Sequence, residues 1–290
     1  MQHPSNGAKL TNMVDKIKRA NPNLHESTFN VLADMYGSDK LYGTESKKPV
    51  SIRKDVGISI EQGAVLHELM RANSVKRSLE VGFASGFSTI WMLDALRSRN
   101  NSQHIAVDLR EKTLWHGVGL TQVERLSFYK RFEWIENLSV HALSGLIQKD
   151  EEFDFVFIDG GHRFDEVIVD FYLADLLVRP GAIIALDDMW MPAVQTATNF
   201  ILNNRAYELI SQPADNMMVL RKQRYDDRDW DHFNNFEIHG LSEASKSSTP
   251  SPVKKLSLPL RSLLSYIRHR LSRWRRKSRL KSSSNAALLG

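Results

Sequence analysis

Five acidic side chains stand where predicted strands end, and they are the residues best suited to chemistry in this chain. They are Glu80, Asp108, Asp159, Asp187 and Asp188. In a parallel sheet the carboxyl ends of the strands meet at one edge, so these carboxylates should share a crevice. Like charges without partners repel and raise one another's pKa. We therefore expect two ligands to relieve this repulsion: a molecule with hydroxyl and ammonium groups, and a divalent cation.

His162 follows Asp159 by three residues, on a turn that contains two glycines. An imidazole held there could take a proton from a substrate hydroxyl that a cation has made more acidic. Carboxylate oxygens from neighbouring strand ends suit Mg²⁺, which keeps several waters and needs few protein ligands. We predict a metal site at Asp159, Asp187 and Asp188, and a catalytic pair of His162 and Asp159. Helix capping by Asp187 or Asp188 and a purely structural His162 are the open alternatives.

The stretch 78–89 predicts a buried strand, a glycine turn and the start of a helix. Gly82 ends the strand, where a glycine permits positive φ and a close approach of a ligand to the backbone. Gly86 stands where the helix begins, so the free N–H groups of its first turn should face the crevice. An ordinary strand-to-helix turn is the alternative. The residues of this stretch predicted to bind the ligand are Glu80, Gly82, Phe83, Ala84, Ser85, Gly86 and Ser88.

Two further polar residues follow the next predicted strands. Asp108 ends the second strand, a position where a carboxylate commonly accepts hydrogen bonds from a ribose diol, in adenosyl and nicotinamide ligands alike. Asn137 follows the third strand and could contact an adenine edge, or simply form a turn. We include both in the predicted cofactor site, together with Asp159.

The elements that must position these residues alternate along the chain. We expect strands over 78–82, 104–108, 131–135, 153–159 and 182–186, and a final strand pair over 207–210 and 217–220. We expect helices over 10–19, 27–35 (with Ser27 as N-cap), 60–72, 88–97, 112–125, 140–148, 164–178 and 192–203. Apolar strands separated by helices favour a parallel sheet covered on both faces. The predicted fold is α/β: a Rossmann-like, doubly wound, mostly parallel seven-stranded sheet with a terminal antiparallel strand, an N-terminal helical cap and a basic C-terminal tail.

Composition narrows the class of protein. The chain has 290 residues, 42% of them hydrophobic, which is enough to bury a core. It has no cysteine, which excludes disulfides, thiolate metal sites and cysteine nucleophiles. It shows no apolar signal segment and no run of about 18 apolar residues. We expect a cytoplasmic protein.

Charge is distributed unevenly. Residues 241–290 carry 12 Lys and Arg and a single acid, while residues 1–240 carry 27 basic and 33 acidic residues. Helical spacing of apolar residues from Leu260 to Trp274 predicts a basic amphipathic helix over 257–281. Such a helix is typical of an element that binds an anionic membrane surface or a partner protein. This places the protein in the cytoplasm, with attachment to the inner membrane face as an option. A solvated tail is the alternative, and nucleic acid is disfavoured because no fold for base readout is recognisable.

The motifs of residues 77–220 resemble the class I S-adenosylmethionine-dependent methyltransferases, in the form found in bacterial small-molecule O-methyltransferases. The matching motifs are Glu80-x-Gly82-x-x-x-Gly86-x-Ser88, Ile158-Asp159-Gly160-Gly161-His162, Leu177-x-x-Pro180-Gly181 and Asp187-Asp188. The resemblance implies that residues 80–88 hold the methionine part of S-adenosylmethionine and Asp108 its ribose. It also implies that Asp159, Asp187 and Asp188 bind the cation. The chain departs from that pattern with Ala84 in place of a glycine, a histidine in place of the usual lysine base, and Asp-Asp in place of Asp-Asn.

The expected function is S-adenosylmethionine-dependent O-methylation of a small hydroxylated metabolite or sugar, assisted by Mg²⁺ with His162 as base. The alternatives are a nicotinamide-dependent oxidoreductase, which leaves Glu80 and Asp187-Asp188 without a role, and a non-catalytic binding protein on the same fold. The expected organisation is a cap or lid over 1–60, a methyltransferase domain over 61–225, a linker over 226–256 and the tail over 257–290. A homo-oligomer is left open.

Overall fold

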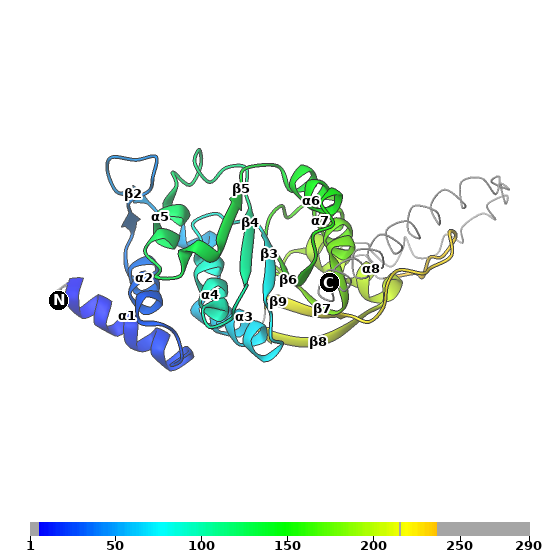
Figure 1. Ribbon diagram of the computed structural model, residues 1–290, viewed down its shortest axis with the longest axis horizontal. Helices are drawn as coiled ribbons and strands as arrows, with labels where there is room; N and C mark the ends of the chain where they lie inside the picture. The colour runs from blue at the N-terminus through cyan, green and yellow to red at the C-terminus, as the bar shows by residue number, and fades with distance from the viewer. Residues whose placement is uncertain (1–5, 215, 237–290) are drawn as a thin grey trace, which may run out of the picture. The chain divides into compact units, whose positions relative to one another are not determined.

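This computed structural model describes residues 6–214 and 216–236. A seven-stranded sheet forms the centre of the fold. Its strands are β3 (Arg77–Val81), β4 (Gln103–Val107), β5 (Phe132–Ile135), β6 (Phe153–Ile158), β7 (Val178–Leu186), β8 (Tyr207–Ala214) and β9 (Met217–Lys222). They lie in the order β5-β4-β3-β6-β7-β9-β8; the first five are parallel, and β9 is antiparallel to both of its neighbours (Figure 1). The predicted Rossmann-like, mostly parallel sheet is confirmed.

Helices cover both faces of the sheet. On one side lie α1 (Asn6–Ala20), α2 (Glu26–Gly37), α3 (Ile60–Ala72), α4 (Phe87–Leu96) and α5 (Val118–Glu124); on the other lie α6 (Ser139–Gln148), α7 (Phe164–Leu177) and α8 (Pro192–Asn204) (Figure 1). The central strands alternate accordingly, because successive side chains of a strand point to opposite faces. In β6, Phe155 and Phe157 pack under α3 and α4, whereas Val156 and Ile158 pack under α6 to α8.

A buried polar network attaches the N-terminal helices to this frame. His67 of α3 is fully buried, and its ring nitrogens lie 2.7 Å from Asn21 Nδ2 and 2.8 Å from Asp94 Oδ2. Asp94 of α4 also accepts hydrogen bonds from the Thr28 hydroxyl (2.6 Å) and the His25 N–H (2.9 Å). Because every member of a buried network needs a partner, these bonds fix α1 and α2 against α3 and α4.

A short hairpin follows α2. It consists of β1 (Lys40–Leu41) and β2 (Val50–Ser51), and a 3₁₀ turn over Lys54–Val56 leads on to α3. Within the hairpin, the N–H of Thr44 donates to the carbonyl of Gly117 (3.2 Å). The loop between β4 and α5 therefore packs against the N-terminal segment.

Two predictions of local structure are wrong. The helix expected over 112–125 begins only at Val118, because His116 and Gly117 take left-handed φ values of 56° and 72° and turn the chain. The N-cap of α2 is His25, whose ring accepts the N–H of Ser27, rather than Ser27 itself. The other helices and strands lie within a few residues of their expected bounds, except that α1 and β7 each begin four residues earlier, at Asn6 and Val178, and β8 runs on to Ala214.

The basic tail over 257–290 and most of the linker over 226–256 lie outside the described residues. The expected domain boundaries at residues 60 and 225, which lie within the described residues, stay predictions. Among the described helices, none is long and apolar enough to cross a membrane.

Candidate functional site

The site lies where the strand order reverses. The chain runs from β3 outward to β4 and β5 and then returns to the other side of β3 as β6, so the ends of β3 and β6 are adjacent. The N–H of Asp159 donates to the carbonyl of Val81 at 2.9 Å. A cavity of about 780 Å³ opens above these two strand ends. Ligands of open α/β sheets bind at such a reversal.

Gly82 makes this junction possible. Its φ is 97°, and a Cβ at this position would lie 2.1 Å from the carbonyl oxygen of Asp159. Any side chain here would meet both a strained backbone and a collision with β6. The glycine predicted to end the strand is therefore required by packing as well as by the turn.

Asp108 joins the end of β4 to the glycine turn. One carboxylate oxygen accepts the N–H groups of Phe83 (3.2 Å) and Ala84 (2.9 Å), and the other accepts the N–H of Arg110 (2.6 Å). These bonds fix the carboxylate at the cavity wall. Asn137 lies on the same wall.

The predicted turn residues divide into two groups. Gly82 and Ala84 line the large cavity, and Ser85 lines a separate hollow of about 140 Å³. The remaining residues lie behind the cavity wall rather than on it: Glu80, Phe83, Gly86 and Ser88. Phe83 is buried and packs its ring on Phe132, 5.2 Å between centroids.

The expectation that Glu80 points into the crevice is wrong. Leu79 and Val81 face α6 to α8, so the alternation of the strand turns Glu80 toward α4. Its carboxylate is fully buried and accepts the hydroxyls of Ser88 and Thr89, and it lies 3.0 Å from Nε2 of His104. Glu80 therefore fixes the first turn of α4 from below.

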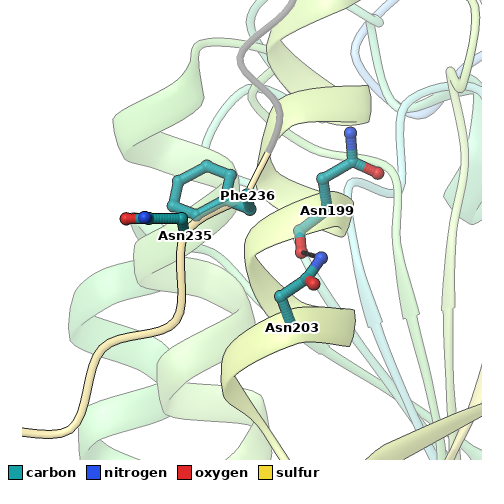
Figure 2. Close-up of a pocket in the computed structure, with 4 residues that line it drawn as sticks. All are labelled: Asn199, Asn203, Asn235 and Phe236. Carbon is teal, nitrogen blue, oxygen red and sulfur yellow. Dashed lines mark hydrogen bonds between the residues drawn. The ribbon is translucent and has the colours of Figure 1, made fainter. Parts of the chain in front are cut away.

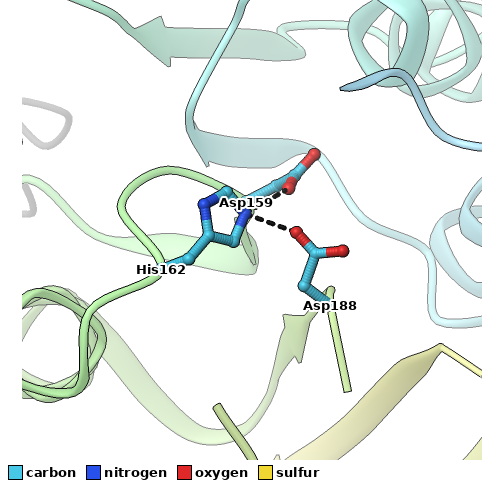
Figure 3. Close-up of side chains that lie close together, drawn as sticks. All are labelled: Asp159, His162 and Asp188. Atoms are coloured by element: carbon cyan, nitrogen blue, oxygen red, sulfur yellow. Dashed lines mark ion pairs between the residues drawn. The ribbon is translucent and has the colours of Figure 1, made fainter. Parts of the chain in front are cut away.

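Three side chains of the acidic edge come together: Asp159, His162 and Asp188 (Figure 3). His162 Nε2 forms an ion pair with Asp188 and lies 3.8 Å from Asp159 Oδ1. One possible ligand atom from each residue lies within 4.8 Å of the others. Among the described residues, Nε2 of His162 is buried without a hydrogen bond of good geometry. Two carboxylates this close together fit a divalent cation, and the imidazole lies beside them.

The charged groups of this cluster shift one another's pKa values. The neighbouring carboxylates of Asp159 and Asp188 raise the pKa of His162 to about 10. Burial, together with the charges of Asp187 and Asp188, raises the pKa of Asp159. Asp188 keeps a lowered pKa in spite of its burial, because His162, Trp190 and Asn216 all donate toward it. A cation would relieve the repulsion among these carboxylates.

Asp187 and Asp188 share Asn216 as a hydrogen-bond donor but otherwise have different partners. Asp187 is buried and accepts hydrogen bonds from Gln62 Nε2 (2.7 Å) and Asn216 Nδ2 (3.2 Å). Asp188 has a left-handed φ of 60° and accepts from Trp190 Nε1 (2.8 Å). The structure thus brings Asp188, not Asp187, against His162. Capping is also ruled out for both carboxylates, since α8 begins after Met191 without a side-chain cap.

Several cavity residues were not predicted from the sequence. Gln62 belongs to the capping box at the start of α3, which the pattern Ser59-x-x-Gln62 could have signalled. Asn216 comes from the turn between β8 and β9, and Asp170 from α7. No local signal indicates that these three side chains reach the same cavity.

A third hollow, of about 430 Å³, lies on α8 and is lined by Asn199, Asn203, Asn235 and Phe236 (Figure 2). The Nδ2 of Asn203 donates to the carbonyl of Asn199 at 2.8 Å, which is a contact within the helix. None of its lining residues titrates. This hollow therefore offers no acid or base.

Comparison with known proteins points to one family. A family model described as a methyltransferase domain matches residues 79–189. A catechol O-methyltransferase from Niastella koreensis is 26% identical over 195 residues, which cover 62% of this chain and 85% of that protein. Tapetum-specific methyltransferase 1 of Arabidopsis thaliana is 24% identical over 158 residues, 53% of this chain and 64% of that protein. The match therefore spans somewhat less than two thirds of this second relative's length.

The fold has solved counterparts. The O-methyltransferase TomG from Streptomyces achromogenes, involved in tomaymycin synthesis and solved in complex with SAM, superposes with a TM-score of 0.55 at 16% identity. The superposition covers 76% of this chain and all of that one. At this identity the likeness concerns the fold alone.

Proposed function

We propose that this chain is a class I S-adenosylmethionine-dependent methyltransferase that transfers the methyl group of S-adenosylmethionine to a hydroxyl oxygen of a small molecule, as the match of residues 79–189 to a methyltransferase family model and the O-methyltransferase relatives support. The proposal rests on one observation: a single cavity is lined both by the predicted cofactor-binding turn and by the predicted acid–base cluster. The glycine turn and Asp108 form one part of its wall, and Asp159, His162 and Asp188 form another. The O-methyltransferases among the relatives support an oxygen acceptor.

The cofactor part of the site would bind and orient S-adenosylmethionine. Asp108, fixed by the N–H groups of the turn, would accept the ribose hydroxyls. Gly82 and Ala84 leave the methionine part free to approach the backbone, and Asn137 would lie near the adenine edge. Transfer of a methyl group from a sulfonium depends mainly on an in-line approach of the acceptor oxygen. Rigid placement of both reactants is therefore the main contribution of these residues.

The acidic part of the site would hold a cation and move a proton. Mg²⁺, when bound, supplies positive charge that lowers the pKa of the acceptor hydroxyl. Asp159 and Asp188, whose carboxylates lie close together beside His162, would hold it, whereas Asp187, the third ligand predicted from the sequence, accepts hydrogen bonds from Gln62 and Asn216. His162 would take the proton from the acceptor, and a cation between the same carboxylates would disfavour the imidazolium and so keep the ring neutral.

The acceptor would be a small hydroxylated ring, such as a phenolic metabolite or a sugar. Trp190 is 66% exposed at the cavity rim, and its indole N–H is bonded to Asp188. Gln62 and Asn216 add amide groups nearby. A flat aromatic surface beside hydrogen-bonding amides suits a ring that carries hydroxyls.

The test is calorimetric titration with S-adenosylhomocysteine and with NAD, followed by methyl-transfer assays on a pool of hydroxylated metabolites with and without a chelator. We expect the first ligand to bind, NAD not to bind, and methylation to stop with the chelator. Binding of NAD alone would replace the proposal with an oxidoreductase. Methylation indifferent to the chelator would remove the cation from it.

A further inference from the structure

Asn216, in the turn before β9, forms hydrogen bonds with four consecutive residues that follow β7. Its side-chain nitrogen donates to Oδ1 of Asp187 (3.2 Å) and to Oδ1 of Asp188 (3.3 Å). Its carbonyl accepts the N–H of Met189 (2.9 Å), and its side-chain oxygen accepts the N–H of Trp190 (3.2 Å). An asparagine suits this position because its amide offers two donor hydrogens and an acceptor at once.

The strand register brings Asn216 to this place. β9 is antiparallel to β7, and Leu186, the last residue of β7, pairs with Met218. Continued by two residues, the same register sets Asp188 opposite Asn216. The pairing of β7 with β9 therefore delivers to this strand end a residue that lies 28 positions farther along the chain.

Asp188 needs such support because its backbone conformation is unfavourable. Its φ is 60°, and a left-handed conformation costs a residue other than glycine about 1–3 kcal/mol and persists where surrounding contacts fix it. The N–H of Met191 donates to the carbonyl of Asp188 (2.9 Å), and Asn216 bonds to the residues before and after it. These contacts stabilise the turn that directs the carboxylate.

The two oxygens of the Asp188 carboxylate have different partners. Oδ1 accepts hydrogen bonds from Trp190 Nε1 (2.8 Å) and from Asn216, and Oδ2 forms the ion pair with His162. Trp190 is 66% exposed, so its indole N–H can bond to water instead, whereas Asn216 is half-buried. Because Oδ1 is held in this way, Oδ2 faces His162 and Asp159, where the cation would bind.

We infer that Asn216 is a positioning residue for the proposed cation site, since it holds Asp188 in the left-handed turn with Oδ2 directed at that site. The inference rests on the proposed function, because it requires a cation at Asp159 and Asp188. It assigns Asn216 no contact with the cation and no part in binding the cofactor. If only a fraction of the molecules holds Asp188 in the competent orientation, the apparent Kd of the cation rises by the inverse of that fraction.

The experiment measures two Kd values for the full chain and for Asn216→Ala. The first ligand is Mn²⁺, which takes the same oxygen ligands as Mg²⁺ and is followed by electron paramagnetic resonance of the free ion. The second is S-adenosylhomocysteine, followed by calorimetry. We expect Asn216→Ala to weaken Mn²⁺ binding roughly 10- to 100-fold, the usual effect of removing a residue that orients a metal ligand. Binding of S-adenosylhomocysteine should change little, because the four bonds of Asn216 all go to residues 187–190.

Two further variants locate the effect. Gln62→Ala removes the other amide that bonds to Asp187 and leaves the hydrogen bonds of Asp188 described above in place. It should therefore weaken Mn²⁺ binding less than Asn216→Ala does. Equal losses in the two variants would indicate that Asp187 transmits the effect and would overturn the inference. Asn203→Ala, at an exposed position of α8, should bind both ligands as the unaltered protein does.

The outcomes separate the inference from the proposed function. Asn216→Ser, whose single hydroxyl cannot bond to both carboxylates, should also weaken Mn²⁺ binding and replaces the alanine variant if that one does not fold. Unchanged Mn²⁺ affinity in a folded Asn216 variant would overturn the inference and leave the proposed function intact. Failure of the unaltered protein to bind Mn²⁺ would overturn both the inference and the cation part of the proposed function. Binding of S-adenosylhomocysteine would then still support the cofactor part.

Discussion

At the scale of single residues, Glu111 is the most unusual acid outside the site. It is fully buried; one oxygen accepts the N–H of Leu120 (3.0 Å), and the other has no hydrogen bond among the described residues. Burial raises its pKa to about 8. Since the folded protein disfavours the ionised form, the stability that Glu111 contributes is complete below its ordinary pKa and is lost as the pH rises through 8.

We therefore expect Glu111→Gln to be more stable than the unaltered protein at pH 9, by about 1–3 kcal/mol, and similar to it at pH 5. A shift of one pKa unit corresponds to about 1.4 kcal/mol, and partial relaxation of the site would reduce the full value. Urea unfolding of both proteins at the two pH values measures the difference. An equal difference at both pH values would show that ionisation of Glu111 has no effect on stability.

His162 supports a second prediction at this scale. Replacement by alanine removes the proposed proton acceptor and should lower kcat by about 100-fold or more. The Kd of S-adenosylhomocysteine should change little, because no proposed cofactor contact is altered. His141→Ala, at an exposed position of α6, is the matched control and should keep full activity. A normal kcat in His162→Ala would exclude the residue as base.

The positions of the site residues along the strands were predictable from the sequence. The directions of their side chains and their partners far away in the sequence were less predictable. Strand-end positions alone placed Asp108, Asp159 and Asp188 at one cavity. The direction of Glu80 follows from the strand alternation, which the motif-based prediction did not apply. The hydrogen bond from Gln62 to Asp187 joins residues 125 positions apart, and no local pattern encodes such a contact.

At the scale of elements, the turn between β3 and α4 depends on Gly82. An alanine at this position would take an unfavourable φ, and its Cβ would lie 2.1 Å from the carbonyl oxygen of Asp159. We expect Gly82→Ala to weaken S-adenosylhomocysteine binding at least tenfold and to lower stability by about 1–3 kcal/mol. Gly145→Ala in α6, where an added Cβ meets nothing within 4 Å, should be neutral or slightly stabilising. Calorimetry and thermal unfolding of both variants test this, and similar behaviour of the two would contradict it.

Element prediction succeeded where the signal was local. Near-continuous apolar runs such as 153–158 predicted the buried strands, because strands covered on both faces need no polar side. The prediction of a helix over 112–125 was wrong for a non-local reason. A Cβ on Gly117 would lie 1.9 Å from the Thr44 hydroxyl, so contact with the N-terminal segment shapes the turn that delays α5.

At the scale of the whole molecule, the two parts of the chain differ in charge. Residues 1–240, which form a compact unit, carry 27 basic and 33 acidic residues and should be repelled by an anionic bilayer. Residues 241–290 carry 12 basic residues and one acid. Each Lys or Arg near an anionic surface contributes about 1 kcal/mol of attraction. Any membrane binding should therefore depend on the tail, which lies outside the described residues.

We expect the full chain to co-sediment with vesicles containing phosphatidylserine and the 1–240 truncation to stay in solution. Binding should weaken as salt is raised, because the attraction is electrostatic. It should also weaken with Trp274→Ala, because the predicted helix would lose apolar surface. Vesicles of phosphatidylcholine alone are the lipid control, and S-adenosylhomocysteine binding by the truncation shows that it is folded. Equal and negligible sedimentation of both proteins would exclude the membrane and leave a partner protein or a solvated tail as the alternatives.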